Sequence, residues 1–144
     1  MASLNATFLG TVSPDAEFDH PEGLPVLRMV GDGLRRGKWT LGALENWRDS
    51  GWSVCCRRDG GEVDVVVAST GTPEEWMVQI APSKVPGLLG RALGRAASAS
   101  ADQCLEVALL VHPILAGRFT RLRWCWDDLP GEESSTATPT PPRR

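Results

Sequence analysis

The sequence predicts an α+β fold in which an antiparallel sheet of about four strands packs against two to four helices on one face. Between residues 52 and 80, three segments alternate apolar and polar side chains and are separated by turn sequences. This pattern is typical of a three-strand meander with one buried face. Residues 119–126 alternate in the same way and predict a C-terminal fourth strand. Apolar residues at helical spacing flank the meander on both sides.

Composition favours a single domain. The chain has 144 residues, of which 42% are hydrophobic, and 15 basic residues against 18 acidic ones give a net charge of −3. This apolar content is enough for one continuous core, and the acidity disfavours nucleic acid as a partner. No window approaches the ~20 apolar residues that span a bilayer, and the polar N-terminus lacks the features of a signal peptide. We therefore expect a cytoplasmic protein that binds neither nucleic acid nor a membrane.

An edge strand and two helices are predicted before the meander. Residues 6–12 are rich in β-prone side chains and end at a turn sequence, so we expect an edge strand there. Apolar spacing between Pro21 and Trp39 predicts a helix of about four turns. Its apolar side consists of Leu24, Leu27, Val30 and Leu34. Helical spacing continues over residues 41–48, and Gly51 follows as a stop signal, which predicts a short second helix.

The meander is the most regular part of the sequence. Arg58-Asp59-Gly60-Gly61 separates its first two strands, and Asp-Gly and Gly-Gly pairs tolerate the positive φ of a tight hairpin. The buried faces of the three strands are expected to consist of Trp52, Val54 and Cys56, then Val63, Val65 and Val67, then Trp76, Val78 and Ile80.

Two further helices are predicted after the meander. A short helix is expected at residues 85–95, and the next helix is expected to be the core element because its apolar residues leave little polar surface on any side. These residues are Cys104, Val107, Ala108, Leu110, Val111, Ile114 and Leu115. Ser98 or Ser100 can cap that helix. Pro113 cannot donate a hydrogen bond within a helix, so we expect a kink or an irregular turn near its end.

The last strand and the tail differ sharply in composition. In the strand, Leu122, Trp124 and Trp126 are expected to face the core, with Arg121, Arg123 and Cys125 pointing the other way. Residues 130–144 are rich in Pro, Ser and Thr and carry too little apolar surface to offset the entropy of ordering them. We therefore expect a single domain at residues 1–129 and a disordered tail at residues 130–144.

No catalytic or metal-binding motif is present in the sequence. The four cysteines form no Cys-x-x-Cys pair, and in a chain without an export signal we expect reduced thiols that fill the core. Phosphate-loop, dinucleotide-binding and zinc motifs are also missing. The sequence therefore predicts no cofactor and no metal, and it favours a protein without enzymatic activity.

Six tryptophans in a chain with no tyrosine are the least ordinary feature of the composition. Most should fill the space between sheet and helices, but Trp and Arg are also enriched in interface hot spots. The candidate docking residues are Arg121 and Arg123 on the outer face of the last strand, Trp39 in a loop, and Glu74 before the third meander strand.

A pocket between the sheet and the core helix is the alternative site. Its candidate polar residues are His112, Glu75, Asp127 and Asp128. Such residues act as acids, bases or cation ligands where they converge. A closed, well-filled interface would favour a binding protein, whereas a deep pocket with these side chains inside it would favour a small-molecule-binding protein or an enzyme.

In size, acidity and order of elements, the chain resembles bacterial toxin-neutralising immunity proteins and the secretion chaperones that hold effector proteins. The resemblance implies a small cytoplasmic protein-binding domain without catalysis, whose partner is another protein. A homodimer formed through a free sheet edge is a further interpretation.

Overall fold

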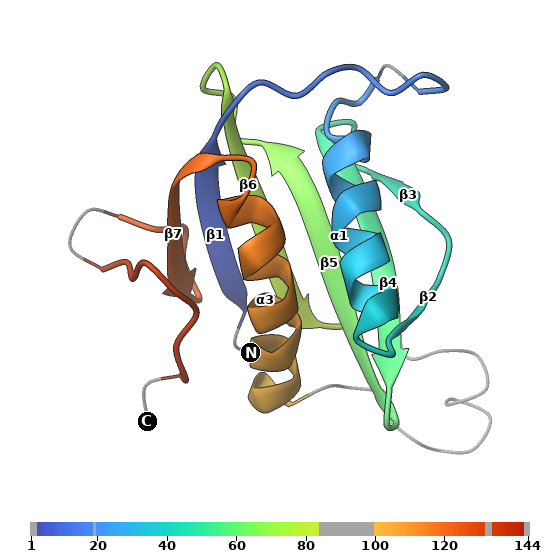
Figure 1. Ribbon diagram of the computed structural model, residues 1–144, viewed down its shortest axis with the longest axis vertical. Helices are drawn as coiled ribbons and strands as arrows, with labels where there is room; N and C mark the ends of the chain where they lie inside the picture. The colour runs from blue at the N-terminus through green and yellow to red at the C-terminus, as the bar shows by residue number, and fades with distance from the viewer. Residues whose placement is uncertain (1–2, 19, 84–99, 132–133, 143–144) are drawn as a thin grey trace.

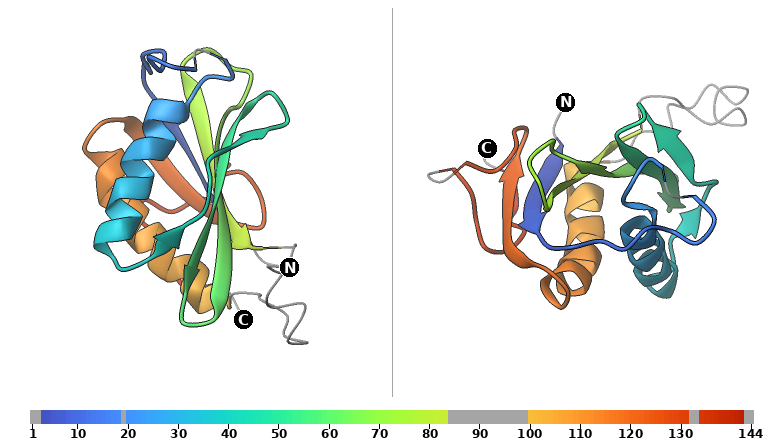
Figure 2. Two further views of the ribbon diagram at one scale, coloured as in Figure 1. Left: turned by 90° about the vertical axis from the view of Figure 1, so that its right-hand side faces the viewer. Right: turned by 90° about the horizontal axis from the view of Figure 1, so that it is seen from above.

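The computed structural model describes residues 3–18, 20–83, 100–131 and 134–142. In chain order its elements are β1 (Leu4–Leu9), α1 (Leu24–Arg36), β2 (Thr40–Leu41), β3 (Glu45–Trp47), β4 (Gly51–Arg58), β5 (Gly61–Ser69), β6 (Glu75–Pro82), α3 (Ala101–Ala116) and β7 (Thr120–Trp126). The strands form one antiparallel sheet in the order β2-β4-β5-β6-β1-β7, and β3 also pairs with β4. Both helices lie on the same face of the sheet (Figures 1 and 2).

The predicted sheet of about four strands is wrong, because the described residues form seven strands and two helices and the fold is mostly sheet. The meander is confirmed as β4, β5 and β6. The first strand is also found, but it is not an edge strand. It lies between β6 and β7 and pairs with both. The helix predicted at residues 85–95 lies outside the described residues.

Where a short helix was predicted at residues 41–48, the structure has the end of β2 and all of β3. Their apolar spacing fits a helix, but the backbone pairs with β4, where Leu41 lies opposite Cys56. Arg48 (φ 52°) and Asp49 (φ 56°) take the left-handed conformation, which closes a tight turn between β3 and β4. Pairing with β4 gives hydrogen-bond partners to backbone N–H and C=O groups of β4 that would otherwise be exposed at the sheet edge. These hydrogen bonds outweigh the preference of residues 41–48 for a short helix.

Both predicted long helices are confirmed. In α1, Pro25 lies in the first turn, and Arg35 and Arg36 lie in the last, where cations interact well with the helix dipole. A capping box joins Ser100 and Gln103 at the start of α3. The helix then continues through Pro113 to Ala116, so the predicted interruption is not seen.

The core lies between the sheet and the two helices. From α3, Val107, Val111 and Leu115 are fully buried, and they belong to the same buried cluster as Phe8 of β1 and Trp124 of β7. The interface between sheet and helix is therefore closed and filled by side chains. Neither described helix is long and apolar enough to cross a membrane.

Candidate functional site

The outer edge of β7 carries an extended segment from the end of the chain, residues 134–142, which we call the C-terminal segment. The backbone N–H of Trp124 donates to the carbonyl of Thr136 at 2.8 Å, and the N–H of Thr136 donates to the carbonyl of Trp124 at 2.9 Å. The two residues form an isolated antiparallel bridge. Because β7 is the last strand in the sheet order, this bridge lies on an edge that no other strand of the described residues covers.

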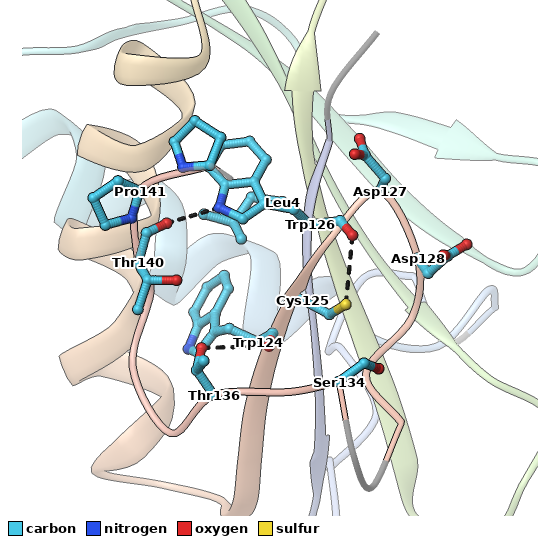
Figure 3. Close-up of a pocket in the computed structure, with 11 residues that line it drawn as sticks. Leu4, Trp124, Cys125, Trp126, Asp127, Asp128, Ser134, Thr136, Thr140 and Pro141 are labelled. Carbon is cyan, nitrogen blue, oxygen red and sulfur yellow. Dashed lines mark hydrogen bonds between the residues drawn. The ribbon is translucent and has the colours of Figure 1, made fainter. Parts of the chain in front are cut away.

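Two side chains of β7, Arg123 and Trp126, also hold the C-terminal segment. Arg123 donates through Nε to Ser135 Oγ at 2.9 Å and through Nη2 to the Ser135 carbonyl at 2.8 Å. The indole N–H of Trp126 donates to the carbonyl of Thr140 at 2.7 Å (Figure 3). Pro139, between these two anchors, is buried. The segment is thus fixed at several points along the strand.

The composition of residues 130–144 predicts disorder, yet the structure places residues 134–142 against β7. Four of the bonds just described use backbone carbonyls or N–H groups of the segment, which every sequence has and which therefore leave no trace in composition. One signal was available. Thr138 and Thr140 each precede a proline, and a residue before proline is restricted to extended conformations.

A pocket of about 440 Å³ lies between β7 and the C-terminal segment (Figure 3). Its lining from the sheet consists of Leu4, Trp124, Cys125, Trp126, Asp127 and Asp128, and its lining from the segment consists of Ser134, Thr136, Thr140, Pro141 and Pro142. The two aspartates also connect β7 to β1. Asp127 Oδ1 accepts from the N–H of Ser3, and the carbonyl of Asp128 accepts from Asn5 Nδ2. The segment therefore does not fill the groove in which it lies.

The predicted docking residues do not come together at one place. Arg123 lies in the site just described, and Arg121 is exposed at the start of the same strand. Glu74 is exposed in the turn before β6 and accepts from the Thr11 hydroxyl. Trp39, next to β2 at the other end of the sheet order, is only 3% exposed and lies under the Arg58 guanidinium. Trp39 is thus a core residue, not an exposed docking residue.

The residues of the alternative pocket do not converge either. His112 Nδ1 accepts from the indole N–H of Trp124 at 3.0 Å, and Glu75 accepts from the Thr70 hydroxyl. Asp127 and Asp128 follow β7 and line the pocket of about 440 Å³, whose lining includes neither His112 nor Glu75. A second pocket, of about 340 Å³, lies at the β4–β5 turn and contains none of the four predicted residues.

Three of the four cysteines are poorly suited to nucleophilic chemistry. Burial and the neighbouring Asp64 carboxylate raise the pKa of Cys55 to about 11, and burial raises that of Cys104 to about 11. Burial also raises the pKa of Cys56 to about 12. These groups are therefore neutral thiols near pH 7, whereas the thiolate is the reactive form. Within the described ranges, no three Cys, His, Asp or Glu side chains are grouped so as to hold a metal ion.

Comparison of the chain with protein-family models, with curated proteins and with solved structures finds no match. The candidate site therefore rests on the geometry of β7 and the C-terminal segment.

Proposed function

We propose that this chain is a small cytoplasmic protein-binding domain without catalytic activity, and that the outer edge of β7 is its docking site. The observation that carries the proposal is the bridge between Trp124 and Thr136, in which this edge already pairs with an extended segment. An exposed sheet edge offers unpaired N–H and C=O groups, and adding a strand to such an edge is a common way to bind a peptide.

Two further observations support a protein partner over a small molecule. The interface between the sheet and α3 is filled by buried side chains such as Val111 and Trp124. Of the four polar residues considered for a pocket there, Asp127 and Asp128 line the groove beside β7 instead, without His112 and Glu75. The net charge of −3 also favours a protein over nucleic acid or an anionic membrane. An immunity-like or chaperone-like protein binds another protein, and an open sheet edge is a surface to which another protein can add a strand.

Photo-crosslinking in living cells tests where the partner docks. Arg121, exposed on β7, is replaced by the photo-reactive residue benzoylphenylalanine, and Arg35, exposed on α1, receives the same replacement as the control. We expect irradiation to give an adduct with another protein from position 121 and not from position 35. An adduct of two copies of this chain at position 121 would indicate a homodimer through the same edge. Equal adducts from both positions, or none from position 121, would contradict the proposal.

A further inference from the structure

We propose that the C-terminal segment is an internal ligand of the β7 edge, and that it competes with a partner segment of the same chemistry. That partner segment is extended and uncharged, and it carries a hydroxyl residue four positions before a proline, as Ser135 stands to Pro139. The inference rests on the proposed function, because it names the ligand class of the same edge and the way in which access to that edge is controlled.

The ligand class follows from what β7 contacts in the C-terminal segment. The Arg123 guanidinium donates to both the hydroxyl and the carbonyl oxygen of Ser135, so this position of the ligand requires a residue with a short hydroxyl side chain. The bridge at Trp124 joins backbone atoms and requires an extended chain, and the Thr136 hydroxyl adds a bond to the Trp124 carbonyl at 3.5 Å. The indole bond of Trp126 contacts a backbone carbonyl and requires no particular side chain. Pro139 fills the buried position between the bridge and the indole bond.

Charge excludes acidic segments from this class. Residues 134–142 contain no charged side chain, and Asp127 and Asp128 line the pocket beside them. An acidic ligand would place like charges next to these two aspartates, and such a juxtaposition is a strong determinant against wrong partners. The groove therefore fits uncharged, hydroxyl-rich segments.

The C-terminal segment is already extended before it binds β7, and a partner segment can still displace it. Thr138 and Thr140 are held in extended conformations by the prolines that follow them, which lowers the entropy cost of binding. A pocket of about 440 Å³ nevertheless remains between the segment and β7. A partner segment that fills this space gains contacts that the internal one lacks. It must also overcome an effective concentration that is on the order of millimolar for a tethered ligand.

Fluorescence anisotropy with a labelled synthetic peptide of residues 134–142, which carries no charged side chain, tests the competition in the full chain. Thr136→Pro in the chain removes the N–H that donates to Trp124, so its own segment should leave the edge. We expect the peptide to bind this variant at least tenfold more tightly than the unchanged chain, because the apparent affinity rises with the fraction of open molecules. The control is Thr136→Ser, which keeps both the N–H and the hydroxyl and should bind the peptide as the unchanged chain does.

A second set of peptides tests the ligand class on the Thr136→Pro chain. Peptides carrying Ser135→Ala or Pro139→Ala should bind at least fivefold more weakly than the parent peptide. If circular dichroism shows that Thr136→Pro does not fold, Pro139→Ala in the chain serves as the second way to release the segment.

Equal affinity of the parent peptide for the unchanged and opened chains would overturn the competition, and equal affinity of all three peptides would overturn the ligand class. Failure of the parent peptide to bind the opened chain would overturn both. None of these results depends on the photo-crosslinked partner, so a crosslink at position 121 together with a failed peptide assay leaves the proposed function standing and removes only this inference.

Discussion

The side chain of Trp124 connects the core to the candidate site. It is fully buried, and its indole N–H donates to His112 Nδ1 on α3 at 3.0 Å. The backbone of the same residue pairs with Thr136 on the outer edge of β7. A substitution that shifts the Trp124 indole at the helix interface therefore also shifts the Trp124 backbone that forms the docking edge.

The hydrogen bond between Trp124 and His112 should be measurable in stability. His112→Ala leaves a buried indole N–H without its acceptor, and we expect a loss of about 1–3 kcal/mol in the free energy of unfolding. Urea unfolding of His112→Ala, Trp124→Phe and the double variant checks this as a double-mutant cycle. The double variant should lose less than the sum of the single losses. Strictly additive losses would mean that the bond contributes nothing to stability.

Residue patterns predicted the orientation of β7 but not what covers it. Alternation placed Trp124 toward the core and Arg123 away from it, and the structure has Trp124 fully buried and Arg123 half-buried under the C-terminal segment. The acceptor of Trp124 could not be predicted, because His112 stands twelve positions away on another element. The segment was missed because its backbone N–H and C=O groups, not its side chains, make most of the bonds to β7.

At the level of elements, local sequence patterns were enough to predict strands that pair with their neighbours in the sequence. The β4–β5 hairpin was predicted from Asp59 and Gly60, which do adopt positive φ, 52° and 79°. In contrast, residues 41–48 have helical spacing but pair with β4, and β1 lies between two strands that are distant in sequence. The number and order of strands depend on pairings between distant segments, and no local pattern records them.

Helix α3 offers a matched pair of substitutions that tests which of its sides is the core. Val111 is fully buried and Leu109, on the same helix, is 53% exposed. Val111→Asp should abolish cooperative folding because it buries an unpaired charge. Leu109→Asp, with the same charge, should leave the free energy of unfolding within about 1 kcal/mol of the parent. Thermal unfolding followed by circular dichroism distinguishes the two, and folding of Val111→Asp would show that α3 does not form the core.

At the level of the whole molecule, the C-terminal segment should add little to stability. Its bonds to β7 each contribute about 0.5–1.5 kcal/mol, and the conformational entropy lost on ordering the segment opposes them. Removing residues 130–144 should therefore shift the thermal midpoint by less than about ten degrees. It should also make Trp126 more accessible to acrylamide, because the indole loses its bond to Thr140. A larger fall would show that the segment is an integral part of the domain.

The quenching measurement needs its own control, since the chain has six tryptophans. Trp126→Phe in both the full and the shortened chain isolates the contribution of this indole. We expect the difference in quenching between the two chain lengths to disappear when Trp126 is absent. A difference that persists would assign the change to another tryptophan.

The position of β1 between β6 and β7 has a consequence for the timing of synthesis. Leu9 contacts Thr120 across 111 positions of sequence and Gly10 contacts Trp76 across 66. At a translation rate of roughly 5–20 residues per second, β7 leaves the ribosome about 5–20 s after β1. During that interval the buried side chains of Leu4 and Phe8 lack their final neighbours. A nascent chain halted before residue 120 therefore keeps one edge of β1 unpaired, and such arrested chains are the species in which aggregation during synthesis is expected.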